Sequence, residues 1–198
     1  MTSRPSPSGT SPLTGVTAAI ESASALDGVV GIIRSVADRL VADDGRSAAL
    51  RAAPLGHALH PVLTDVPLGA WVSATVLDWV GGADMRPASQ RLLGIGNLAY
   101  LPTAVTGLAE FAGLDQKTQR VATVHAVANN VSLVLNTASW AARRSGRHDL
   151  GRVLTLGAMT IGGLGAYLGG HLAIGMKAGT RDHRIPEAHR AEAVVVPS

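Results

Sequence analysis

The stretch Gly56-His57-Ala58-Leu59-His60-Pro61-Val62-Leu63-Thr64-Asp65-Val66-Pro67 carries the strongest structural signal in the sequence. It places two histidines, an aspartate and two prolines at the start of an apolar run that continues to Val80. Polar side chains inside a membrane are costly, and they usually have a partner or a function there. The stretch therefore predicts the polar opening of a membrane helix.

The composition of the whole chain favours a membrane protein over a soluble one. Hydrophobic residues make up 46% and charged residues 16% of the 198 residues, whereas soluble domains usually contain roughly 25% charged residues. The net charge is only +3, and no arginine cluster is interleaved with aromatic residues, so we expect no binding to nucleic acid. The absence of cysteine excludes disulfides and thiolate metal sites.

Four apolar runs predict an all-α fold. A helix needs about 20 mostly apolar residues to cross a bilayer, and a soluble four-helix bundle would show a charged face on every helix. The last three runs carry no charge. With short polar connections, the runs predict an integral membrane four-helix up-down bundle preceded by an amphipathic helix. The runs span residues 59–80, 92–109, 121–142 and 153–176, and the connections span residues 81–91, 113–120 and 143–152.

Polar segments flank this predicted bundle. We expect a disordered leader at residues 1–15, an amphipathic helix with a linker at 16–50, the transmembrane domain at 51–178 and a polar tail at 179–198. The amphipathic helix would lie on the bilayer or pack on the bundle. Both termini then share one side, and a small excess of basic residues there favours the cytoplasmic side of a bacterial-type inner membrane.

The up-and-down topology brings four of the seven histidines to one side of the membrane. This layer consists of His57, His60, His125 and His171, with Asp65 and Glu110 at the same level. The third run also carries a polar stripe at helical spacing, which should face the bundle interior. The stripe consists of His125, Asn129, Ser132, Asn136 and Ser139. The other histidines, at 148, 183 and 189, are expected at the surface.

Two interpretations of the histidine layer are open. The imidazoles either join helices by hydrogen bonds, or they bind a cofactor, since neutral imidazole is a common metal and haem ligand. A b-type haem needs two histidines from different helices. His125 with His171 is the preferred pair, and His60 with His171 is another.

A transition metal ion is the competing ligand. Its site would consist of His57, His60, His125 and Asp65. Pro61 disfavours helical geometry at His60, so His57 and His60 need not share a helix face. Side chains around either ligand would orient the imidazoles. These side chains are Asn129, Asp65, Tyr167 and Glu110.

Three segments of the chain resemble a prokaryotic membrane family, domain of unknown function 2231. They are Gly56-His57-Ala58-Leu59-His60-Pro61 with Asp65-Val66-Pro67-Leu68-Gly69, the segment around His125, and Tyr167-Leu168-Gly169-Gly170-His171. The resemblance covers about residues 50–180 and implies a four-helix integral membrane protein of unassigned activity. Some relatives carry an appended Rieske iron–sulfur domain, which associates the helical part with electron transfer. Because this sequence has no cysteine, the resemblance implies a separate redox protein as partner.

These observations support one leading function and two alternatives. The leading hypothesis is a membrane protein whose histidine layer binds haem b or a metal ion and passes electrons. The first alternative is a small carrier, a proton-linked channel or an assembly component, in which the polar stripe forms a hydrated path or a helix seam. The second is a structural protein whose histidines only tie helices together. An enzyme is disfavoured, because no nucleophile–base–acid set and no phosphate loop is visible.

Overall fold

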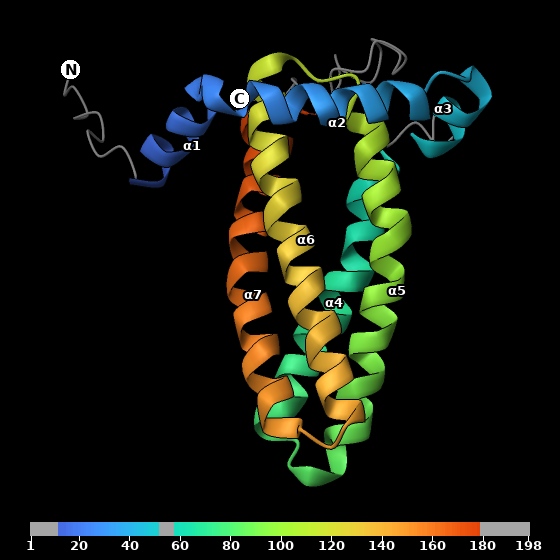
Figure 1. Cartoon of the computed structure of the whole chain (residues 1–198), viewed down its shortest axis with the longest axis vertical. Coiled ribbons are helices and arrows are strands. Elements are labelled where there is room, and N and C mark those ends of the chain that lie inside the picture. The colour runs from blue at the N-terminus through green and yellow to red at the C-terminus, as the bar shows by residue number, and fades with distance from the viewer. Residues whose placement is uncertain (1–11, 52–57, 179–198) are drawn as a thin grey trace, which may run out of the picture.

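The computed structural model describes residues 12–51 and 58–178, and every regular element within them is helical. Four long helices lie side by side, and shorter helices cross one end of them (Figure 1). The all-α prediction is therefore confirmed. The long helices are α4 (Leu59–Val80), α5 (Arg86–Phe111), α6 (Gln116–Arg144) and α7 (His148–Gly170), and a π-helical turn, η4 (His171–Gly175), continues α7.

The four predicted apolar runs lie within these helices, and the first coincides with α4. The last predicted connection, residues 143–152, is wrong. α6 continues to Arg144 and α7 begins at His148, so only residues 145–147 separate them. The helix also includes Arg143 because its guanidinium is buried in the bundle, as described below. His60 is helical despite the following proline, since Pro61 lies within the first turn of α4, where its missing N–H removes no helical hydrogen bond.

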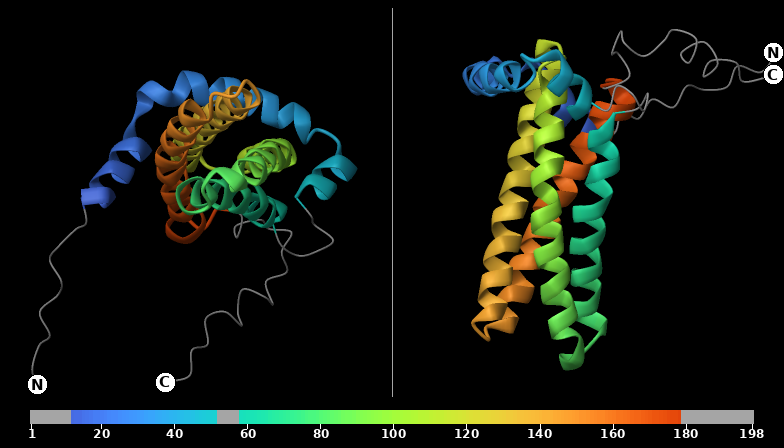
Figure 2. Two further views of the ribbon diagram at one scale, coloured as in Figure 1. Left: turned by 90° about the horizontal axis from the view of Figure 1, so that it is seen from below. Right: turned by 90° about the vertical axis from the view of Figure 1, so that its right-hand side faces the viewer.

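α4 and α5 form one antiparallel hairpin, and α6 and α7 form a second. Helices pack most extensively within each hairpin, and the seam between the hairpins has fewer contacts. Seen from the end, α4 and α6 lie diagonally across the bundle (Figure 2). The seam is therefore where side chains of the two hairpins face each other.

The two hairpins repeat one pattern of burial. Each buried residue of α7 lies 62 positions after a buried residue of α5. The buried residues Pro67, Trp71 and Ala74 of α4 lie 65 positions before Ser132, Asn136 and Ser139 of α6, which are also buried. The residue types at these positions differ, so what repeats is the pattern of buried positions. In this pattern α4 corresponds to α6, and α5 corresponds to α7.

A proline inside α4 helps to join the helices of the first hairpin. Pro67 lacks an N–H, so the carbonyl of Leu63, four residues earlier, receives no helical hydrogen bond from it. The hydroxyl of Thr103 in α5 donates to that carbonyl oxygen at 3.1 Å. The polar group that the proline leaves free is thus satisfied by the neighbouring helix.

The N-terminal helices cross the end of the bundle where α4 begins (Figures 1 and 2). They are α1 (Pro12–Ser22), η1 (Ser24–Leu26), α2 (Asp27–Leu40) and α3 (Asp44–Leu50). α1 and α2 meet at a 55° bend, so the predicted amphipathic segment is two helices rather than one. Val30 and Ala37 of α2 are buried against the bundle, while Val29, Ile32 and Val36 are exposed.

Within the described residues, two helices are long and apolar enough to cross a membrane, residues 83–111 and 148–175. The bent pair of α1 and α2 is a third candidate only if it is counted as one span. The apolar runs at residues 59–80 and 121–142 also predict spans, yet neither α4 nor α6 meets this test. For α6 the reason lies in its polar residues. Its interior stripe contains His125, Asn129 and Asn136, and these side chains lower its hydropathy.

Candidate functional site

His60 in the first turn of α4 points at the neighbouring helix α5. Its Nδ1 lies 2.8 Å from the carbonyl oxygen of Thr103. A carbonyl only accepts, so Nδ1 carries the proton and Nε2 is left with a lone pair. Thr103 also donates its hydroxyl to Leu63, which fixes the α5 backbone at this level.

His125 in α6 makes the equivalent contact in the second hairpin. Its Nδ1 donates to the carbonyl oxygen of Gly165 in α7 at 2.8 Å, and its Nε2 accepts from the Asn129 amide at 3.0 Å. The Nδ1–H to carbonyl bond is the arrangement that orients imidazoles toward a ligand in metal sites. Both histidines are therefore protonated at Nδ1, and each keeps on Nε2 the lone pair with which an imidazole binds a metal.

A glycine backs each ring, four residues after the carbonyl that holds it. A Cβ at Gly107 would lie 2.8 Å from His60 Cε1, and a Cβ at Gly169 would lie 3.0 Å from His125 Cε1. The first distance is shorter than real contacts, and the second is tighter than almost all of them. The small residues of α5 and α7 therefore create the space that the two imidazoles occupy.

The two imidazoles face each other across the seam between the hairpins. Their ring centres lie 6.5 Å apart, and their planes meet at 83°. A metal–imidazole bond is about 2 Å long and the ring centre lies about 1 Å behind the nitrogen, so two imidazoles on opposite sides of one metal have centres about 6 Å apart. The observed separation matches that value.

The other predicted site residues are more dispersed. His171 lies in η4 and its Nε2 is 3.0 Å from Glu21 Oε1, so it contacts α1. Asp65 and Tyr167 are exposed on α4 and α7, and Glu110 is half-buried near the end of α5. His57 lies outside the described residues. Within residues 12–51 and 58–178, no three His, Asp or Glu side chains gather closely enough to hold a metal ion.

The polar stripe of α6 does face the bundle interior. Ser132 donates to the carbonyl of Ala158 at 2.9 Å, and Ser139 donates to that of Gly151 at 2.7 Å. Asn136 is fully buried, and neither its amide oxygen nor its nitrogen has a partner. The serines thus join α6 to α7, while Asn136 keeps an unused hydrogen-bonding capacity.

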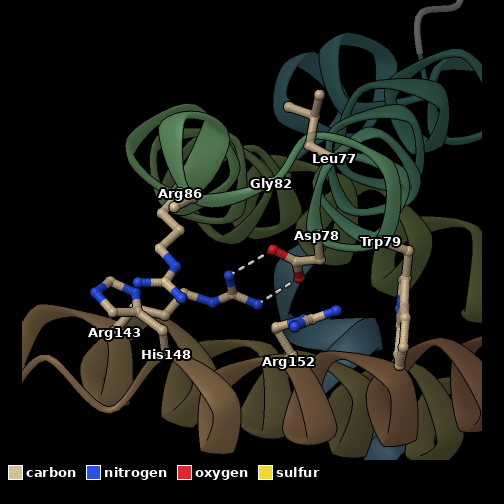
Figure 3. Close-up of a pocket in the computed structure, with 9 residues that line it drawn as sticks. Leu77, Asp78, Trp79, Gly82, Arg86, Arg143, His148 and Arg152 are labelled. Atoms are coloured by element: carbon tan, nitrogen blue, oxygen red, sulfur yellow. Dashed lines mark hydrogen bonds and ion pairs between the residues drawn. The ribbon is translucent and has the colours of Figure 1, made fainter.

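A second polar cluster lies at the opposite end of the bundle (Figure 3). Asp78 of α4 accepts two hydrogen bonds from the Arg143 guanidinium, at 2.7 and 2.6 Å, and their side chains are only 3% and 1% exposed. Arg143 Nη1 donates to Ser89 and Nη2 to Thr155, both at 3.2 Å, and Nε donates to Ser139 at 3.1 Å. The ion pair joins the two hairpins.

Sequence interpretation missed this cluster, because it assigned Arg143 to a polar connection. Two signals were present. Asp78 is a charge inside an apolar run, and the predicted topology brings it to the same end as Arg143. Asp78 also follows His60 by eighteen residues, the spacing that separates Arg143 from His125. Equivalent positions of the two hairpins therefore supply each cluster: His60 and His125 form the first, and Asp78 and Arg143 form the second. His148, expected at the surface, is half-buried beside this ion pair.

The comparisons with known proteins identify a family and no described activity. Residues 56–182 match the family model described as a predicted membrane protein, domain of unknown function 2231. The chain matches no curated protein and no solved structure. The matched region begins just before α4, ends after η4 and so contains both clusters. Because the match covers more than half of the sequence, the chain belongs to the family of predicted membrane proteins known as domain of unknown function 2231.

Proposed function

We propose that α4, α5, α6 and α7 all cross the bilayer. Support comes from the distribution of polarity, which is inverted relative to a soluble protein. Fully buried positions include Ser89, Ser132, Asn136, Ser139 and Thr155. Large apolar side chains point outward from all four helices, as lipid contact requires. Examples are Val62, Val76, Leu98, Leu101, Val127, Val134, Val153 and Leu164.

We further propose that His60 and His125 bind one b-type haem between the two hairpins and that the protein transfers electrons within the membrane. The observation that carries this proposal is the facing imidazole pair, with ring centres 6.5 Å apart and each Nδ1 held by a backbone carbonyl. His60 and His125 would hold the haem iron through their Nε2 atoms, and the bound haem would supply one-electron redox chemistry. Asn129 would release Nε2 of His125 when the iron binds.

His60 replaces His171 in this proposal as the partner of His125. His171 hydrogen-bonds to Glu21 of α1, whereas His60 faces His125 across the seam. A redox protein in the membrane or at its surface would exchange electrons with the haem. The proposed location is a bacterial-type inner membrane with both chain ends on the cytoplasmic side. The paired hairpins support a shared side, because both begin and end at the same end of the bundle (Figure 1). The small excess of basic residues there favours the cytoplasmic side.

The absorption spectrum of the purified protein tests this function. The wild-type protein, after haem supplementation, should show a Soret band and sharp α and β bands on reduction. His60→Ala and His125→Ala should each lose the sharp α and β bands, because only one of the two histidines that would bind the iron remains. His171→Ala is the matched control and should keep them.

Two glycine variants separate loss of the site from loss of the fold. Gly107→Ala should reduce haem content, because its Cβ would displace the His60 ring, whereas Gly163→Ala, which meets nothing within 4 Å, should not. Circular dichroism and gel filtration verify folding of every variant. A folded wild-type protein that stays colourless would contradict the proposal, as would loss of the spectrum in His171→Ala alone.

A further inference from the structure

A basic pocket opens beside the Asp78–Arg143 ion pair, at the end of the bundle away from the paired histidines. Its volume is about 190 Å³. Arg86, Arg143, His148 and Arg152 line it together with Asp78 and Trp79, so the lining contains three guanidinium groups and a single carboxylate (Figure 3). Asp78 is already engaged by Arg143 through both of its oxygens. The remaining charge of the pocket is therefore positive.

The pocket contains buried polar atoms that find no hydrogen-bond partner among the residues the structure describes. Arg152 Nε, which is a donor, is one of them, and His148 Nδ1 is another. The nearest carboxylate to Arg152 is that of Asp149, which is 90% exposed and lies 3.9 Å from Nη1. A buried guanidinium N–H without an acceptor costs free energy that a bound anion would recover.

Two helix N-termini add to the positive potential. Arg86 is the first residue of α5 and His148 is the first residue of α7, so the repeat of the two hairpins brings both helix starts to this pocket. The N-terminus of a helix carries a partial positive charge, which favours a nearby anion. The guanidinium groups and both helix starts thus favour the same kind of ligand.

With four membrane crossings, as proposed above, the tryptophans at this end of the bundle favour a position of the pocket at the depth of lipid headgroups. Arg152 lies over the ring of Trp79 at 4.6 Å, and Arg144 lies over the ring of Trp140 at 5.1 Å. Tryptophans next to arginines are typical of the membrane–water interface. A phosphate group is the common anion at that depth, and guanidinium groups bind it through paired hydrogen bonds.

We propose that this pocket binds a phosphate group, with Arg152 and Arg86 as its cationic partners and Arg143 fixed behind them by Asp78. The phosphate belongs to an anionic lipid headgroup or to a soluble phosphate. This site is independent of the proposed haem site, and only its lipid source rests on the membrane crossings proposed above.

Lipid retention by the full-length protein tests the first source. The protein is purified in detergent containing equal amounts of phosphatidylglycerol and phosphatidylcholine, and native mass spectrometry measures the lipid that remains bound. The wild-type protein should retain phosphatidylglycerol, and Arg152→Gln should retain about tenfold less, as expected for loss of one charge-assisted contact. Arg144→Gln is the matched control, because it also loses an arginine stacked on tryptophan but lies outside the pocket.

Thermal unfolding of the delipidated protein tests the second source. If phosphate is the ligand in solution, potassium phosphate should raise the unfolding temperature of the wild-type protein above that in potassium chloride of equal ionic strength, and Arg152→Gln should lose this difference. If Arg152→Gln misfolds, both measurements are repeated with Arg86→Gln, which replaces an exposed residue of the pocket. Retention without phosphate stabilisation identifies a lipid, and stabilisation without retention identifies soluble phosphate. Equal behaviour of the wild-type and pocket variants in both measurements, or an equal loss in Arg144→Gln, would overturn the proposal.

Discussion

At the scale of single residues, the buried pair of Asp78 and Arg143 is the contact on which the bundle depends most. Burying a charge is costly, and the cost is offset only while the partner and the surrounding hydrogen bonds are present. Here Arg143 uses all three guanidinium nitrogens, through Asp78, Ser89, Ser139 and Thr155. Loss of either charge therefore leaves the other unpaired in the bundle.

Replacing this arginine should destabilise the protein far more than replacing its neighbour. Arg143→Gln should lower the free energy of unfolding by about 3–5 kcal/mol, the usual cost of breaking a buried pair. Arg144→Gln removes an exposed charge and should change it by less than about 0.5 kcal/mol. Reversible unfolding in detergent with increasing dodecyl sulfate measures both.

An apolar double variant distinguishes a lost charge partner from lost packing. Asp78→Leu combined with Arg143→Met should be more stable than Arg143→Gln alone, because neither charge is then stranded. A double variant that is less stable than the single one would show that shape, rather than charge, governs this position.

The residue types of both clusters were visible in the sequence, but their pairings were not. Spacing placed His60 and His125 in one layer, and the structure shows that they face each other. It also placed His171 there, yet η4 carries that side chain to Glu21 of α1. The rotation of each helix about its axis selects partners, and rotation depends on packing that a single apolar run does not encode.

At the scale of elements, α2 is attached to the bundle by one well-formed ion pair. Arg120 at the start of α6 donates to both carboxylate oxygens of Asp27, at 2.7 and 2.8 Å, and to the backbone of Glu21 at 2.8 Å. These hydrogen bonds lower the pKa of Asp27 below its ordinary value of 3.8. The attachment of α2 is therefore linked to pH.

Acid should release α2 only below the ordinary pKa of an aspartate. Because the pKa of Asp27 is lowered in the folded protein, its contribution is complete above pH 3.8 and is lost as the pH falls through the lower, folded value. A spin label on Ser35→Cys, an exposed position of α2, should stay immobile at pH 6 and gain mobility in acid.

Two variants assign this acid release to the ion pair. Asp27→Asn should make the label mobile already at pH 6. Asp38→Asn, on the same helix but paired only with the exposed Arg34, should behave like the parent protein. A label that is equally immobile in Asp27→Asn and in the parent would show that apolar packing alone holds α2.

The existence of the helices was the most predictable level of the structure. Apolar runs, three of them without any charge, predict all four long helices, since only a helix satisfies the backbone of such a run in lipid. The sequence does not predict where α6 ends and α7 begins, because it does not distinguish a buried arginine such as Arg143 from an arginine in a loop. The bend between α1 and α2 was missed because both helices continue one amphipathic pattern.

At the scale of the whole molecule, the proposed topology places the two hairpin turns on one side of the membrane and α2 on the other. The sequence contains no cysteine, so a single introduced thiol reports its own position. In sealed inner-membrane vesicles of known orientation, Asp84→Cys and Ser145→Cys, which are exposed at the hairpin turns, should react with an impermeant maleimide from the same side. Ser35→Cys should react only from the opposite side. Labelling of all three from one side would contradict four membrane crossings.

The position of the Asp78–Arg143 pair also restricts how hairpins recognise one another. His60 and His125 are both histidines at equivalent positions of the two hairpins. Two copies of the same hairpin would therefore form a pair of histidines as well as the two different hairpins do. The ion pair behaves differently. A homodimer of first hairpins would set one aspartate against another, and a homodimer of second hairpins would set two arginines together, both unfavourable when buried. This single opposite-charge contact thus favours the pairing of unlike hairpins over the pairing of like ones.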